Sequence, residues 1–282
     1  MTEREKLLYK MIWQLVSLLA FLLAIIIGLT CLLFFGIPDW HKSKLKTQSI
    51  DTVSIKVNAS KKAWQAPDIS QESDPEVKYG KELIANTSAY LGPSGKVMKI
   101  SNGMNCQNCH LEAGTKIYGN NYSAVAATYP KFRARSGTEE NLFKRINDCI
   151  ARSLNGAALD KDNKEMKAMI AYINWVGKDV PKNESPAGAG LMELSYLSRP
   201  ADPVAGKALY LAKCMVCHQE KGEGLLNNDK SGYIYPPLWG KKSYNIGAGL
   251  YRLSRFAGYI KANMPLGASH DNPQLTDEEA WD

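Results

Sequence analysis

The chain has 282 residues, a formal net charge of +7 and 45% hydrophobic residues, which is enough apolar material for one large domain or two small ones. The basic residues are spread along the whole chain. They suit anionic substrates, anionic partners or a membrane surface, and they do not mark a nucleic-acid interface. We therefore expect no nucleic-acid partner. Only six cysteines and four histidines are present, which limits the residues that could bind a metal.

The first expected element is a membrane-spanning helix. Residues 15–35 are apolar with only four small or polar interruptions, and the segment is about as long as the hydrocarbon core of a bilayer is thick. A cleaved signal peptide is the main alternative, but its apolar region would be shorter and would end in small residues. Cys31 lacks the small residues expected before a lipidated cysteine, so we interpret it as a passive apolar side chain. Residues 1–37 are predicted to form a cytoplasmic stub and a single transmembrane anchor.

Residues 38–75 are predicted to be a tether, because three prolines lie among Ser, Lys, Asp and Gln with little periodicity. One short strand is expected over 53–57, where valine and isoleucine alternate with polar residues. Apolar residues then recur at helical spacing and predict a helix over 74–90.

Two copies of the sequence Cys-x-x-Cys-His organise the rest of the chain. This spacing is typical of covalent c-type haem attachment, in which two thiols form thioethers with the haem and the histidine lies under the iron. A pair of zinc sites is the alternative, but structural zinc motifs rarely end both cysteine pairs in an immediate histidine. We therefore expect two covalently bound c-type haems. The attachment residues are Cys106, Cys109 and His110 in the first motif, and Cys214, Cys217 and His218 in the second.

A basic patch at residues 131–135 follows the first motif, and helical patterns follow the patch. Thr138 is predicted to be the N-cap of a helix that carries two glutamates in its first turn. Helical spacing places Cys149 on the apolar side of that helix, so its thiol is expected to face inward. A further helix is predicted over 165–176.

The two halves align as repeats, and the alignment puts Cys149 and Met264 in equivalent places. It also predicts that Thr276, with Glu279 three residues later, starts a last helix as a capping box, which we expect to be truncated at Asp282. The predicted fold is mainly α, with two tandem cytochrome c-type helical domains behind a single N-terminal transmembrane helix. The domains are 76–185 with the first haem, a linker over 186–202, and 203–282 with the second haem and a truncated C-terminal helix.

Each motif histidine fills one axial position of its iron, so a second ligand must come from elsewhere in each domain. For the second haem, Met264 lies in the loop position usual for a thioether ligand; a structural role for Met264, or ligation by His270 or Lys261, are the alternatives. The first domain has no spare histidine. Cys149 is the remaining candidate there, beside the simpler interpretation of an inert packed cysteine.

Six spaced segments carry a family resemblance: 105–111, 118–122, 132–137, 145–149, 235–240 and 260–265. Together they resemble the dihaem thiosulfate dehydrogenases, periplasmic enzymes that form tetrathionate and, in some members, reduce it. The resemblance runs from about Trp64 to the end of the chain. The sequence departs from the family pattern in two respects. It has a predicted membrane anchor, whereas many members are soluble, and its expected C-terminal helix is truncated.

The resemblance implies His110 and Cys149 as ligands of the first haem, and His218 and Met264 as ligands of the second. It further implies a catalytic role for Cys149, whose sulfur would join the outer sulfur of thiosulfate before a second thiosulfate displaces it. Arg133 and Arg135 are expected to hold the dianion; contacts with haem propionates or a solvated surface are the alternative for this pair.

The predicted function is the coupling of two thiosulfates to tetrathionate, or the reverse, because two haems can hold the two electrons released. The second haem would pass them to an external acceptor such as a small cytochrome c. A dihaem electron carrier without its own substrate is the alternative, and a haem-linked sensor or assembly module is disfavoured because no signalling domain follows. Since bacteria attach c-type haem outside the plasma membrane, we expect a single-pass inner-membrane protein with periplasmic haem domains.

Overall fold

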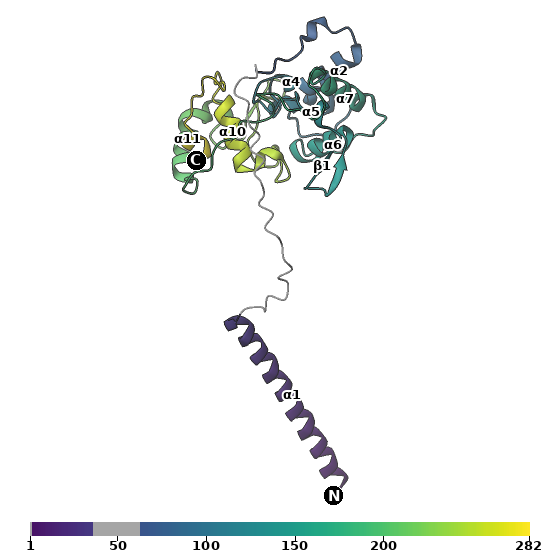
Figure 1. Cartoon of the computed structure of the whole chain (residues 1–282), viewed down its shortest axis with the longest axis vertical. Coiled ribbons are helices and arrows are strands. Elements are labelled where there is room, and N and C mark those ends of the chain that lie inside the picture. The colour runs from purple at the N-terminus through teal and green to yellow at the C-terminus, as the bar shows by residue number, and fades with distance from the viewer. Residues whose placement is uncertain (1, 36–62) are drawn as a thin grey trace. The chain divides into compact units, whose positions relative to one another are not determined.

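The computed structural model describes residues 2–35 and 63–282, and the chain divides into a first unit over Met1–Val57 and a second over Asn58–Asp282. The strand expected over 53–57 lies outside the described residues. In the first unit, helix α1 spans Glu3–Phe35 (Figure 1). It is long and apolar enough to cross a membrane. The helix begins before the apolar segment because Glu3 and Glu5 in its first turn complement the helix dipole.

The second unit consists mainly of short helices joined by long loops (Figure 1). Its first half begins with α2 (Pro75–Ala85), where the Asp74 side chain accepts from the Glu76 N–H and Pro75 fills the first turn. The single helix predicted over 74–90 is wrong in one respect. It breaks at Asn86, whose backbone is not helical, and continues as α3 (Thr87–Leu91).

Two short helices and a hairpin follow the first attachment turn, namely α4 (Leu111–Gly114), α5 (Val125–Thr128), β1 (Lys131–Arg133) and β2 (Thr138–Glu140). The strands pair antiparallel, with Arg133 opposite Thr138. The prediction that Thr138 caps a helix is therefore wrong. Helix α6 (Leu142–Ser153) begins later, and the Asn141 side chain caps it by accepting from the Lys144 N–H.

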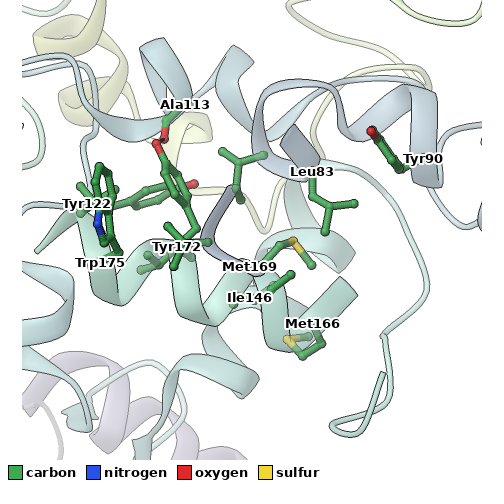
Figure 2. Close-up of a cluster of buried hydrophobic side chains, with 14 of the residues drawn as sticks. Leu83, Tyr90, Ala113, Tyr122, Ile146, Met166, Met169, Tyr172 and Trp175 are labelled. Carbon is green, nitrogen blue, oxygen red and sulfur yellow. Dashed lines mark hydrogen bonds between the residues drawn. The ribbon is translucent and has the colours of Figure 1, made fainter. Parts of the chain in front are cut away.

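The core of this half lies between α2 and α7 (Lys164–Val176). The two helices approach so closely that a Cβ on Gly80 would lie 2.0 Å from the Ala168 carbonyl oxygen. Figure 2 shows the Tyr172 ring at the centre of this core, where its hydroxyl donates to the Ala113 carbonyl oxygen at 3.0 Å. The predicted helix over 165–176 is confirmed within one residue.

The second half starts with α8 (Pro203–Leu209), which runs through a π-helical turn (Tyr210–Cys214) into α9 (Met215–His218). A continuous helical segment thus leads directly into the second motif. A small hairpin follows, β3 (Leu225–Leu226) with β4 (Tyr233–Tyr235), and then α10 (Leu253–Asn263) and α11 (Asp277–Trp281). Thr276 and Glu279 form the predicted capping box of α11.

The segment between the halves lies against the first half and does not run free. The Tyr118 N–H donates to the Gly188 carbonyl at 2.9 Å, and the Asn120 N–H donates to the Gly190 carbonyl at 2.8 Å. On its other side, a Cβ on Gly258 of α10 would lie 1.9 Å from the Met192 carbonyl oxygen. The segment is thus part of the packed structure of both halves.

Candidate haem centres and active site

Both motif histidines are oriented by the same kind of hydrogen bond. The His110 Nδ1 atom lies 2.6 Å from the Asn120 carbonyl oxygen, and the His218 Nδ1 atom lies 2.9 Å from the Pro236 carbonyl oxygen. A carbonyl oxygen can only accept, so Nδ1 carries the proton in each ring and Nε2 keeps the lone pair that binds a metal. This orientation suits an axial haem ligand.

Burial also keeps the two imidazoles neutral. It lowers the pKa of His110 to about 4, and it lowers the pKa of His218 in the same direction. A metal binds the neutral form of histidine, so both rings are prepared for ligation. The His110 ring packs on Tyr122, with ring centroids 4.6 Å apart, which further fixes its plane.

The first attachment turn is held by the helix that precedes it. The Cys106 N–H donates to Thr87 Oγ1 at 2.9 Å, and the Ser88 N–H donates to Asn105 Oδ1 at 2.8 Å. The side chains of Asn105 and Asn108 cap the turn reciprocally. Every cysteine thiol that the structure describes is free, in both motifs, and so is available for a thioether bond.

The zinc alternative lacks support. Within residues 2–35 and 63–282, no group of three His, Cys, Asp or Glu side chains converges as a metal site. A structural zinc site needs four such ligands. Each motif instead offers one neutral imidazole beside two thiols, which is the donor set of a covalently attached haem.

A cavity faces His110 in the first half. It is partly open to solvent and has a mainly apolar lining with a few polar groups, as is usual for a cofactor site. Cys106, Cys109 and His110 form part of its wall, and apolar side chains of α2, α6 and α7 form much of the rest. The residues present therefore fit a haem.

Cys149, on α6, lies in the wall of the same cavity as His110. It interacts electrostatically with its neighbours. It is the largest cause of the raised pKa of Arg145, one helical turn earlier, and it adds to the effect of burial on the pKa of Cys106 and Cys109, raised to about 11 and about 12. The structure thus brings together a histidine nitrogen and a cysteine sulfur that could ligate one iron.

Three cations line this cavity. Arg133 is there as the sequence suggests, and the alternation of strand β1 places Lys131 on the same side while Phe132 points outward with 67% of its surface exposed. Arg145 is the third. Sequence reasoning missed Lys131 and Arg145 as site residues, although the spacing of four residues between Arg145 and Cys149 already places them on one helix face.

Arg135 does not join this group, contrary to the expectation from the sequence. It lies in the turn between β1 and β2, and its Nη1 donates to the Gly247 carbonyl oxygen at 2.7 Å. The register of the hairpin explains the difference. Arg133 is the last paired residue of its strand, so the chain has turned away from the cavity two residues later.

In the second half, Met264 follows directly on α10 and is partly buried. The alternative ligands are engaged elsewhere. Lys261 Nζ lies 2.7 Å from Asp277 Oδ1 and donates to the Leu275 carbonyl oxygen, while His270 pairs with Asp271 at 3.1 Å. These contacts favour Met264 over both.

A largely apolar hollow, partly open to solvent, lies in this half. Its lining begins two residues after the carbonyl of Pro236 that orients His218, and continues to α10. The second attachment motif and Met264 are not part of this lining. The lining residues are Leu238, Trp239, Gly240, Tyr244, Leu250, Tyr251, Leu253 and Phe256.

Two family models match the chain. The SoxA/TsdA cytochrome c domain matches residues 96–181, and the cytochrome c family matches residues 203–282. Each match contains one Cys-x-x-Cys-His motif, so the two helical halves are two cytochrome c domains behind one N-terminal apolar helix.

The chain is similar to curated thiosulfate dehydrogenases. It is 41% identical to that of Allochromatium vinosum over 207 residues, which cover 72% of this chain and 73% of the relative. It is 33% identical to that of Stutzerimonas stutzeri over 268 residues, which cover 94% of this chain and 82% of the relative.

A solved structure is also similar, the thiosulfate dehydrogenase (TsdBA) from Marichromatium purpuratum in its "as isolated" form. The TM-score is 0.71 at 30% sequence identity, over 78% of this chain and 47% of that chain, so the present chain spans about half of the solved protein's length. With two c-type haem domains and relatives of this extent, the chain is an oxidoreductase that carries two c-type haems, and it belongs to the thiosulfate dehydrogenase family.

Proposed function

We propose that the chain couples two thiosulfates to tetrathionate at the first haem cavity and releases the electrons through the second haem. One observation carries the proposal. A single cavity contains the haem-attachment cysteines, His110, the Cys149 thiol and cationic side chains. The relatives of this chain are named thiosulfate dehydrogenase. Thiosulfate is a small dianion, and the cationic side chains of the cavity can bind it.

In this proposal, His110 and Cys149 ligate the first iron, and His218 and Met264 ligate the second. Cys106 and Cys109 hold the first haem by thioether bonds, and the second motif holds the other in the same way. The bound haems supply two one-electron acceptors, which together hold the two electrons of the reaction.

The chemistry of Cys149 is a sulfur–sulfur exchange. The Cys149 thiolate and the outer sulfur of one thiosulfate form a bond with loss of two electrons, which leaves Cys149–S–S–SO₃⁻. The outer sulfur of a second thiosulfate attacks the sulfur next to Cys149, as a thiolate attacks a disulfide. The bond to Cys149 breaks, its electron pair restores the thiolate, and tetrathionate leaves. The same steps in reverse would reduce tetrathionate.

The cationic side chains explain how two dianions can approach a thiolate. Lys131, Arg133 and Arg145 lie around the Cys149 cavity, and guanidinium groups bind oxyanions with directed hydrogen bonds. Arg133 is steadied by Glu140, with 3.9 Å between Nε and Oε2. The pKa of Arg145 is raised, mainly by its interaction with Cys149, so its guanidinium stays charged. These groups reduce the repulsion between like-charged reactants.

The wider arrangement is proposed as follows. Helix α1 anchors the chain in the bacterial inner membrane as a single span, and the haem domains over 76–185 and 203–282 lie in the periplasm with a linker over 186–202. The predicted periplasmic tether over 38–75 is too long at its end, because Trp64 is buried in the core of the first haem domain and donates its N–H to the Ala187 carbonyl; the tether is proposed to end before Trp64. An external acceptor, such as a small cytochrome c, receives the electrons from the second haem. The length and composition of α1 support the anchor.

Purified, haem-loaded protein tests the proposal directly. With thiosulfate and an oxidant it should release electrons and form tetrathionate, whereas the Cys149→Ala variant should retain both haems and lose this activity. Cys149→Met keeps a sulfur ligand but cannot form the adduct, so it should also be inactive. Unchanged turnover in both variants would rule out the Cys149 chemistry, whereas no thiosulfate-dependent electron release by the unmodified protein would leave only a dihaem electron carrier.

A further inference from the structure

The end of the helix that carries Cys149 is held by the second cytochrome c domain. The Asn245 side-chain Nδ2 donates to the Ala151 carbonyl oxygen at 3.0 Å, and the Asn245 backbone N–H donates to the Arg152 carbonyl oxygen at 2.9 Å. Both carbonyls belong to the last turn of α6. Carbonyls in the last turn of a helix have no partners within the helix, so these two depend on Asn245.

Asn245 is itself fixed by its own loop. Its Oδ1 accepts from the Gly247 N–H at 2.8 Å, and its carbonyl oxygen accepts from the Ala248 N–H at 2.9 Å. Nδ2 also donates to Asn155 Oδ1 at 2.7 Å. Both the oxygen and the nitrogen of the amide therefore form hydrogen bonds, which fixes the orientation of the side chain. In this orientation Nδ2 points toward the end of α6.

Neighbouring contacts hold the loop over residues 243–247 in place. Asn102 Nδ2 donates to the Ser243 carbonyl oxygen at 3.1 Å, and Asn155 Nδ2 donates to the same oxygen at 2.5 Å. Arg135 Nη1 donates to the Gly247 carbonyl oxygen at 2.7 Å. The two domains thus meet through several hydrogen bonds around the end of α6, and Asn245 is the residue that contacts the helix carbonyls.

The contact is close to the reactive thiol along the helix. Ala151 and Arg152 follow Cys149 by two and three residues, within the same turn, so a shift or loosening of the last turn displaces the Cys149 side chain. A displacement of about 1 Å is enough to lower the rate of a positioned reaction substantially. Ligation of an iron by sulfur is equally sensitive to the position of the sulfur.

We propose that Asn245, although it lies in the second domain, is a positioning residue for Cys149. It fixes the position of α6 so that the Cys149 thiol can ligate an iron that His110 also ligates. The first haem therefore has both protein ligands only when the second domain packs against α6. The catalytic consequence rests on the proposed function. The consequence for ligation of the first haem does not.

The test compares three variants of the full, haem-loaded chain. Asn245→Ala removes both ends of the amide, while Asn245→Asp keeps an oxygen for the Gly247 N–H and loses the donor to the Ala151 carbonyl. Asn227→Ala is the matched control. Asn227 closes a turn of its own loop in the same domain, donating to Ser231 Oγ at 3.0 Å and accepting from the Gly232 N–H at 3.2 Å.

We expect both Asn245 variants to lose at least half of the His–thiolate low-spin signal in the ferric electron paramagnetic resonance spectrum, while the signal of the second haem is retained. The kcat for thiosulfate-dependent electron release should fall about 10-fold with KM within twofold, as expected when only the reacting geometry changes. The Asn227→Ala control should match the unmodified chain in both measurements.

A wild-type His–thiolate signal and kcat in both Asn245 variants would overturn the proposal. Equal loss of the signals of both haems would also overturn it, because that result indicates general unfolding. Should Asn245→Ala not accumulate as holoprotein, Asn245→Asp decides. If the unmodified chain has the His–thiolate signal but does not oxidise thiosulfate, the proposed function fails, while the comparison of signals still decides the role of Asn245.

Discussion

The Tyr259 hydroxyl donates a hydrogen bond to the Asn108 carbonyl oxygen at 2.8 Å. Tyr259 belongs to α10 of the second domain, and Asn108 lies between the two cysteines of the first attachment turn. The helix that leads to Met264 therefore rests on the turn that attaches the other haem. Burial keeps the hydroxyl protonated, because it raises the pKa of Tyr259 well above its ordinary value.

Tyr259→Phe should lower the free energy of unfolding by about 1 kcal/mol, because a partly buried hydrogen bond to the Asn108 carbonyl is lost. Tyr259 is only 5% exposed, whereas Tyr196 is 80% exposed, so Tyr196→Phe is the control and should change stability by less than about 0.5 kcal/mol. Denaturant titration of the holoprotein measures both. Equal stability of the two variants would contradict the importance of this contact.

Arg145→Gln should lower kcat/KM for thiosulfate by about 10-fold to 150-fold, the range that corresponds to loss of a charged hydrogen bond of about 1.5–3 kcal/mol. The side chain lines the Cys149 cavity. Arg255→Gln is a suitable control, because Arg255 lies on the surface with Glu193 at 3.5 Å. Steady-state kinetics with both variants decides, and a loss below twofold for Arg145→Gln would argue against a role at the cavity.

Glu140 should make stability depend on pH in the acid range. The pKa of its carboxyl lies below the ordinary value of 4.5, chiefly because of an interaction with the Ser136 side chain. The Lys144 and Arg133 side chains lower this pKa further. The carboxylate is thus favoured in the folded state, so its contribution is fully present above pH 4.5 and is lost as the pH falls through the lower folded pKa. Between pH 6 and pH 3, the free energy of unfolding should fall less steeply with pH in Glu140→Gln than in the unmodified chain. Equal slopes in the two proteins would show that Glu140 does not cause this pH dependence.

Gly80→Ala should destabilise the first domain by about 1–3 kcal/mol, because the added Cβ would lie 2.0 Å from the Ala168 carbonyl oxygen and force α2 away from α7. The control is Gly249→Ala, since a Cβ at Gly249 meets nothing within 4 Å. Thermal unfolding of the two variants should separate them clearly. A melting temperature for Gly80→Ala equal to that of the control would show that the helices can move apart at little cost.

Met264→Ala should abolish the methionine-to-iron charge-transfer band of the oxidised second haem, whereas Lys261→Ala should retain it. The reason is that the Lys261 ammonium is bound to Asp277 at 2.7 Å and to the Leu275 carbonyl. Optical spectra of the two variants provide the measurement. Loss of the band in Lys261→Ala alone would assign the ligand to the lysine.

Local signals in the sequence predicted much of the fold. The two attachment motifs, the apolar N-terminal helix and the capping box at Thr276 and Glu279 each depend on residues a few positions apart, and the structure contains all three. The hairpin was not predictable in this way. Thr138 followed by two glutamates is typical of a helix start, but pairing with β1 and burial of Glu140 among cations decide for a strand.

The parts of the candidate site that the sequence did not reveal depend on distant contacts. Arg133 and Arg135 look equivalent in the sequence, and only the register of the hairpin separates them. Asn245 lies almost a hundred residues from Cys149, and no local pattern connects it with α6. Long-range packing of this kind requires the fold itself, whereas spacing within one helix, as between Arg145 and Cys149, does not.

The segment between the domains has a consequence for dissecting the protein. The Gly190 carbonyl holds the Asn120 N–H, and the Asn120 carbonyl in turn holds the His110 ring. If the first haem domain were expressed alone and ended before Gly190, the Asn120 backbone would lose this hydrogen bond. The carbonyl that orients the His110 ring would then be less firmly held. A first domain prepared for study should end beyond Met192, or its redox behaviour will describe an artefact of the cut.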